Sequence, residues 1–99
     1  MIFEKLQRAG IPCAYSHFKA KKLTPPYIVY IGAGQDTFAA DDTWIWRENN
    51  YQIEYYFTKK DEEKESLVEN ILLEEGYLYT KSEDVYIEDQ RVYVIYYQI

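Results

Sequence analysis

The first residues of the chain repeat apolar side chains at helical spacing. Ile2, Phe3 and Leu6 fall on one face of a helix, and Gly10 is a residue type that commonly ends one. The pattern therefore predicts a short helix over residues 1–9.

Two β-prone stretches follow this helix. Residues 14–18 are compatible with a first strand, and residues 27–31 are a continuous β-prone run. Pro25 and Pro26 stand just before the second run, where a missing N–H removes no hydrogen bond from a sheet. Between the two runs we expect a basic, solvated connection that contains Lys19, Lys21 and Lys22.

Small and polar residues occupy positions 32–42. Gly32 and Gly34 end the preceding β-prone run, and the segment is predicted to be an exposed loop, longer than most connections. It contains one large apolar side chain, Phe38, which we expect to anchor the loop on a neighbouring molecule. The open alternative is a loop that packs against its own domain.

The stretch 43–58 is β-prone and is interrupted by Asn49 and Asn50, which are compatible with a turn, a bulge or a bend. In an uninterrupted strand the side chains alternate between two faces. The core phase then holds Ile45, Tyr51, Ile53, Tyr55 and Phe57. Trp44 and Trp46 take the opposite, polar phase, which makes them candidate partner-binding residues. If the asparagines reset the phase, both tryptophans return to the core instead.

A second helix is predicted from Asp61 to just before Gly76. Asp61 is a favourable N-cap, and Glu62 and Glu63 stand in the first turn, where the helix dipole favours negative charge. One apolar stripe consists of Leu67, Val68, Ile71 and Leu72. Gly76 is expected to end the helix.

Two strands complete the pattern. The first is predicted at residues 77–81, with an extension through residues 85–87 left open, and the second at residues 91–99, after a turn at residues 88–90. The predicted order is α-β-β-β-α-β-β. Because short connections favour antiparallel pairing, we expect a single α+β domain over residues 1–99. Its architecture would be a two-layer sandwich, with a mostly antiparallel sheet of four to five strands and two helices on one face.

Composition adds information about partners and compartment. Aromatic residues make up 18% of the 99 residues, and twelve are tyrosines, which suit half-buried strands and partner surfaces. The formal net charge is −6, so we expect no specific nucleic-acid binding, because phosphate backbones are repelled. No stretch is apolar enough for a membrane span and the first residues lack a secretory-signal pattern, so we expect a soluble protein made in the cytoplasm.

No residue pattern points to catalysis, a cofactor or a metal ion. Cys13 and His17 are four residues apart, which brings them together only on a helix, and the preceding proline argues against one. Gly32 and Gly34 lack the third glycine and the following helix of a dinucleotide-binding loop. The abundant carboxylates, those of residues 61–65 among them, are expected on solvated surfaces. We therefore predict a protein that is not an enzyme.

The order of motifs resembles a group of viral proteins. It consists of Leu-Thr-Pro-Pro-Tyr-Ile-Val-Tyr at residues 23–30, a small-residue loop, Tyr-Gln-Ile-Glu-Tyr-Tyr at residues 51–56, an acidic helix and a closing tyrosine-rich strand. This order resembles the small tail-completion, tail-terminator and head–tail joining proteins of long-tailed bacteriophages and prophages.

The resemblance implies a structural protein that acts in virion assembly at the head–tail junction. It implies a ring homo-oligomer, commonly a hexamer, that contacts tail-tube and head-completion proteins, first in the cytoplasm of the bacterial host and then in the virion. It implies no cofactor and transfers no site residues. The alternative interpretation is a monomeric adaptor or regulatory protein-binding module without enzymatic activity, and oligomeric state separates the two.

Overall fold

The computed structural model describes residues 2–15, 24–40 and 44–99, and its fold is α+β. The helical elements are α1 (Ile2–Leu6), the 3-10 helix η1 (Gln7–Ala9) and the main helix α2 (Glu62–Glu74). The strands are β1 (Cys13–Tyr15), β2 (Tyr27–Ala40), β3 (Trp44–Phe57), β4 (Thr80–Lys81), β5 (Val85–Ile87) and β6 (Val92–Gln98). The expected fold class is confirmed, with six strands where four to five were predicted.

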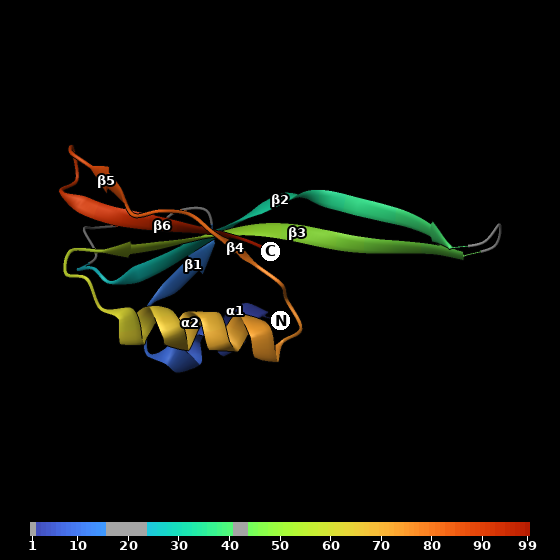
Figure 1. The fold of residues 1–99 in the computed structure, drawn as a ribbon, viewed down its shortest axis with the longest axis horizontal. Helices are drawn as coiled ribbons and strands as arrows, with labels where there is room; N and C mark the ends of the chain where they lie inside the picture. The colour runs from blue at the N-terminus through green and yellow to red at the C-terminus, as the bar shows by residue number, and fades with distance from the viewer. Residues whose placement is uncertain (1, 16–23, 41–43) are drawn as a thin grey trace.

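The sheet is mixed but mostly antiparallel. Its strands follow the order β1-β2-β3-β6-β4, and β5 also pairs with β6. Among the strands of the described residues, only β1 and β2 run parallel. Both helices lie against one face of this sheet (Figure 1).

The short strands differ from the sequence pattern. Of the strand predicted at residues 14–18, the first two residues belong to β1, and the rest lies outside the described residues together with the basic connection. The strand predicted at residues 77–81 is only two residues long, because β4 pairs with β6 at Thr80 and Lys81 alone. The extension at residues 85–87 is a separate strand, β5.

The core lies between the helices and the sheet face that they cover. Along β3, the side chains of Ile53, Tyr55 and Phe57 point to this face and are buried, as the alternation predicted. The complete buried cluster consists of Leu6, Ile11, Ile28, Ile53, Tyr55, Phe57, Val68, Ile71, Leu72, Ile95 and Tyr97.

Helix α2 begins where the sequence predicted and buries a different stripe. The carboxylate of Asp61 accepts hydrogen bonds from the backbone N–H groups of Glu63 (3.1 Å) and Lys64 (3.3 Å), which confirms the N-cap. Leu67 was expected in the core but is 48% exposed, whereas Glu65 is 2% exposed. The reason is geometric: at roughly 100° per residue, Leu67 falls outside the arc of the helix that the buried residues Glu65, Val68, Ile71 and Leu72 occupy.

The segment at residues 32–42 is not the predicted loop. β2 continues to Ala40 and β3 starts at Trp44, and the two strands pair along most of that length. Small and polar side chains are compatible with this because backbone hydrogen bonds hold the pair. Residues 41 and 42 lie outside the described residues.

The irregularity expected at the asparagines lies on the partner strand. Ala33 and Gly34 of β2 together stand opposite Asn50, so β2 carries a bulge and β3 stays continuous through Asn49. Gly34 has φ 96°, a left-handed conformation that glycine adopts without steric cost. The phase along β3 is therefore not reset.

Beyond the bulge the two strands leave the body of the molecule. We call residues 33–40 and 44–50 the arm; it extends past both helices (Figure 1). The principal extents are 51 × 26 × 24 Å, and the Cα radius of gyration is 15.1 Å. A compact chain of this length has a radius of gyration of about 13 Å, so the arm accounts for an elongated shape.

Candidate functional site

Phe38 and Trp46, two of the predicted interaction residues, meet across the arm. They are direct partners in the register of β2 and β3, and they are 53% and 56% exposed. Aromatic side chains of this size usually bury most of their area, in the core or against a partner. The structure thus brings together two residues that the sequence placed in a loop and in a strand.

Trp44 is the third predicted interaction residue. It begins β3 and pairs with Ala40 in the register, in the same phase as Trp46. Its side chain lies outside the part of the chain whose side chains the structure describes. Binding of a partner by these residues stays a prediction.

The assignment of Ile45 to the core is wrong, because Ile45 is 77% exposed. It has the same phase as the buried Ile53, but the helices do not reach the arm and leave both of its faces uncovered (Figure 1). Tyr51, nearer the body, is partly buried against the core cluster. Phase therefore decides burial only where a second layer covers the strand.

Two carboxylates stand next to the aromatic pair. Asp36 and Glu48 are direct partners in the register, two residues from Phe38 and Trp46 and therefore on the same face of the arm. Like charges directly opposite each other destabilise a strand pair. Asp36 accepts a hydrogen bond from Asn50 Nδ2 at 2.9 Å, which offsets part of that repulsion.

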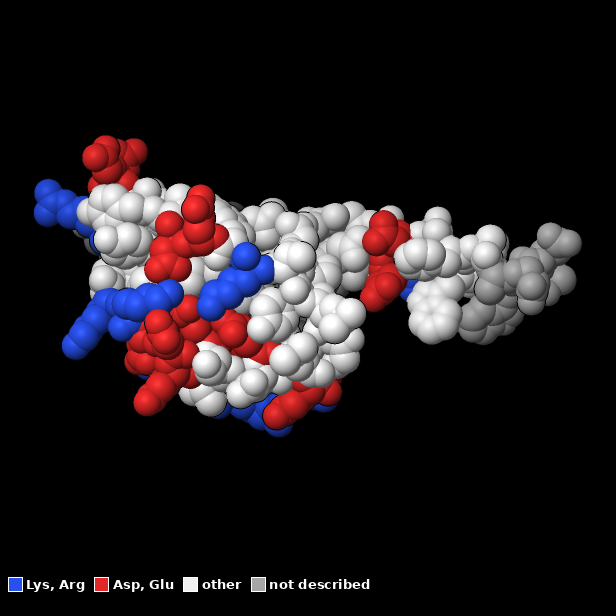
Figure 2. Space-filling view, viewed as in Figure 1, with Lys and Arg blue, Asp and Glu red and all other residues white. Residues whose placement is uncertain are grey.

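We call Asp36, Phe38, Trp46 and Glu48 the aromatic face of the arm. Outside this face, charged side chains are concentrated on the body, and acidic ones gather over α2 (Figure 2). The described arm carries one basic residue, Arg47, on its opposite face. The aromatic face thus offers apolar area bordered by negative charge.

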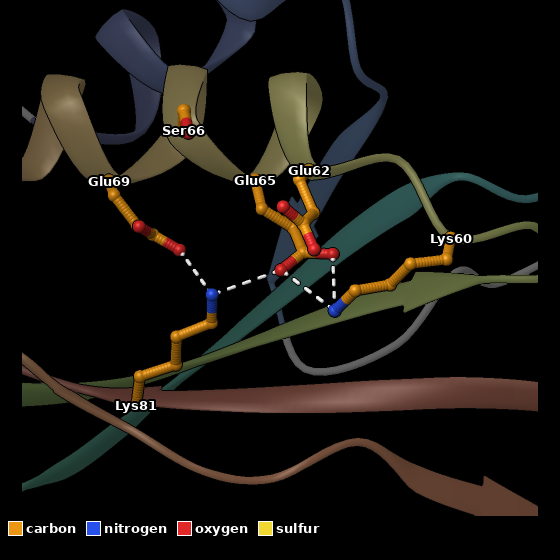
Figure 3. Close-up of a pocket in the computed structure, with 6 residues that line it drawn as sticks. All are labelled: Lys60, Glu62, Glu65, Ser66, Glu69 and Lys81. Atoms are coloured by element: carbon orange, nitrogen blue, oxygen red, sulfur yellow. Dashed lines mark hydrogen bonds and ion pairs between the residues drawn. The ribbon is translucent and has the colours of Figure 1, made fainter.

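A polar pocket of about 290 Å³ lies between α2 and the sheet. Figure 3 shows carboxylates of α2 pointing toward the ammonium groups of Lys60 and Lys81, which approach from the connection before α2 and from β4. The residues that line the pocket are Lys60, Glu62, Glu65, Ser66, Glu69 and Lys81.

Glu65 is the centre of this pocket. Its Oε2 atom lies 2.8 Å from Lys60 Nζ, and its Oε1 atom lies 3.0 Å from Lys81 Nζ. Oε2 has no aligned hydrogen-bond donor among the described residues, so its contact with Lys60 is an ion pair. Lys81 Nζ also lies 2.8 Å from Glu69 Oε2.

The charges in the pocket stabilise one another. Burial alone would lower the pKa of Lys81, but hydrogen bonds to Glu69 and Glu65 outweigh it and raise the pKa. Burial alone would raise the pKa of Glu69, yet hydrogen bonds from Lys81 and from Tyr97 Oη at 2.7 Å lower it. Glu69 and Lys81 therefore favour their charged forms, and the network ties α2 to β4 and β6.

Sequence reasoning missed this network. It placed the carboxylates of residues 61–65 on solvated surfaces, and Glu65 is instead buried. One signal was present, because Glu65 precedes Val68 by three residues and Leu72 by seven, which is the spacing of a single helix face. The lysine partners carry no comparable signal, since Lys81 is sixteen residues away in the chain.

Within the part of the chain that the structure describes, the other candidate ligands form no assembled centre. In the described ranges, no three side chains of His, Cys, Asp or Glu are placed to hold a metal ion. Cys13 is half-buried, and burial raises the pKa of its thiol to about 11. His17 lies outside the described residues. The helices of the described chain are also too short or too polar to cross a membrane.

No model of a protein family matches the chain, and no curated protein matches its sequence.

Proposed function

We propose that this chain is a structural protein of a bacteriophage or prophage that acts in virion assembly at the head–tail junction, as a component of a tail-terminator or tail-completion ring. Its partners would be other copies of itself and the tail-tube and head-completion proteins. It would be made in the cytoplasm of the bacterial host and then become part of the virion.

The observation that carries this proposal is the arm. A two-stranded hairpin is marginally stable in water, and this one presents Phe38 and Trp46 away from the core. Among the described residues, no third strand pairs with the outer edges of the arm beyond Ile31 and before Tyr51. A projecting element of this kind gains stability when a neighbouring subunit covers it, which is the situation of a protein that works inside a ring.

Two features of the sequence support the same function. The order of strand motifs resembles tail-completion and head–tail joining proteins over nearly the whole chain. The net charge of −6 is compatible with a junction through which DNA passes, because an acidic wall does not retain phosphate backbones.

The test is particle assembly. Deleting the gene from a phage that encodes it should leave filled heads and tails that do not join, or tails of irregular length, visible by negative-stain electron microscopy. Wild-type protein supplied from a plasmid should restore joined particles, and antibody labelling should place it at the junction. Normal particles without the protein would contradict the proposal and favour the monomeric adaptor.

A further inference from the structure

The end of the molecule opposite the arm carries a second exposed aromatic pair. Tyr86 of β5 and Tyr93 of β6 are register partners, their ring centroids are 4.9 Å apart, and they are 49% and 38% exposed. Strand β5 and the turn into β6 lie at the far end of the body from the arm (Figure 1). The two aromatic pairs therefore stand at opposite ends of the long axis.

Two basic residues lie just outside the strands at this end of the body. Lys59 and Arg91 each stand two residues beyond the last register partners of β3 and β6, Phe57 and Tyr93. Both are exposed, and neither has an ion-pair partner within the described ranges. Lys60, by contrast, is occupied by Glu65 and Asp84. Figure 2 shows basic side chains at this end of the body.

We call Lys59, Tyr86, Arg91 and Tyr93 the tyrosine end. Its composition complements the aromatic face of the arm, because each consists of an aromatic pair and two charges, with opposite signs on the two surfaces. Glu88 and Asp89 lie in the turn beside Arg91, so this complementarity comes from Lys59 and Arg91 and not from the net charge of the end.

We propose that the aromatic face of the arm docks on the tyrosine end of a second copy of this chain. Phe38 and Trp46 pack against the neighbour's two tyrosines. The neighbour's Lys59 and Arg91 lie between Asp36 and Glu48 and relieve their mutual repulsion. The contact deepens the ring assembly proposed above by naming the two surfaces that join.

Charge favours this head-to-tail arrangement over an arm-to-arm dimer. A two-fold contact between two arms would bring the Asp36 and Glu48 carboxylates of both copies together, four negative charges with no cation on that face. In the head-to-tail contact, each copy uses one arm and one tyrosine end. Such a contact is heterologous, and it gives a closed ring when the rotation between neighbours closes.

Charge reversal tests the contact directly. We expect Glu48→Arg alone and Arg91→Glu alone each to raise the dissociation constant for self-association by about tenfold. The double variant E48R/R91E should recover to within about threefold of the wild type, because the two reversed charges are again opposite in sign. Sedimentation velocity at micromolar concentration and native mass spectrometry measure the association.

Controls separate the contact from folding. Glu74→Arg reverses an exposed charge on α2, at neither surface, and should leave association unchanged. Arg91 has φ 54°, so Lys59→Glu provides a second reversal that leaves the turn intact. Circular dichroism confirms that each variant is folded. A monomeric wild type, unchanged association in the single variants, or no recovery in E48R/R91E would overturn the inference.

The outcome also separates this contact from the proposed function. If the chain associates through these two surfaces but phage particles assemble without it, the contact is supported and the proposed function is refuted. If particle assembly requires the chain but tolerates both single charge reversals, the proposed function is supported and this contact is refuted.

Discussion

At the scale of single residues, the buried carboxylate of Glu65 governs the behaviour of its neighbours. Lys60 and Lys81 keep their ammonium groups within 3.0 Å of its oxygens while the rest of each lysine stays partly exposed. A buried charge without a partner is strongly destabilising, whereas a paired one is close to neutral. The two lysines thus contribute to stability mainly by pairing with the buried Glu65 carboxylate.

Lys81→Met should lower the free energy of unfolding by about 1–3 kcal/mol near neutral pH, because Glu65 and Glu69 both lose a cation. Lys64→Met, at a lysine of α2 without an ion pair in the described residues, serves as the matched control and should change it by less than about 0.5 kcal/mol. Urea denaturation of both variants measures the difference. Equal effects would show that the pocket network contributes little.

The same variant has a predictable pH dependence. The pKa of Glu69 is lowered in the folded state, so the stability it contributes is present above its unfolded pKa of about 4.3 and is lost as the pH falls through the folded value. The difference in free energy of unfolding between wild type and Lys81→Met should therefore become smaller below about pH 4.3. A difference in unfolding free energy that stays constant below this pH would argue against the Glu69–Lys81 pair as its cause.

At the scale of elements, α2 and the arm owe their stability to different sources. Helix α2 has a side-chain N-cap and a buried stripe, and both are local in sequence. The arm has backbone pairing, one bulge and half-exposed aromatic residues, with no helix beneath it. We therefore expect single substitutions to change the stability of α2. We expect the stability of the arm to depend on contacts with a neighbouring molecule.

Asp61→Ala should lower the free energy of unfolding by about 1 kcal/mol, because two backbone N–H groups lose their acceptor. Glu62→Ala keeps the cap and is the comparison variant. Thermal denaturation followed by circular dichroism gives both values. If Asp61→Ala is as stable as Glu62→Ala, the cap hydrogen bonds are not significant in solution.

Helix α2 and the arm also show which features of the fold can be predicted from the sequence and which cannot. The cap at Asp61, the stop at Gly76 and the core phase of Ile53 and Tyr55 follow from short-range patterns, and they were predicted. The arm was not, because residues 32–40 have the composition of a loop and become a strand only by pairing in a hairpin with residues 44–51, and that pairing leaves no mark in their own composition. The ion pairs of Glu65 were missed for the same reason.

At the scale of the whole molecule, the body and the arm differ in their share of the buried core. The body holds the buried core, and the arm extends the long axis to 51 Å without adding to that core. We therefore expect a change in the arm to alter the proposed self-association while leaving the fold of the body intact.

Replacing Phe38 and Trp46 together by alanine should abolish self-association while changing the free energy of monomer unfolding by less than about 1 kcal/mol, since both are about half exposed. Tyr55→Ala, in the core, should lower it by about 3–5 kcal/mol. Native mass spectrometry and urea denaturation on the same preparations give the two readouts. A large stability loss in the arm variant would mean that these aromatic residues belong to the fold.

The bulge at Ala33 and Gly34 has a consequence for how the arm can change in length during evolution. If β2 kept all its residues and paired with β3 without the bulge, in the register that holds up to Gly32, Phe38 would face Ile45 and lie on the other side of the ribbon from Trp46. Inserting or deleting a single residue between the bulge and Phe38 would also separate Phe38 from Trp46. Inserting or deleting one residue in each of the two strands would keep the aromatic residues paired. Homologous arms should therefore differ in length by even numbers of residues, except where the bulge itself is gained or lost.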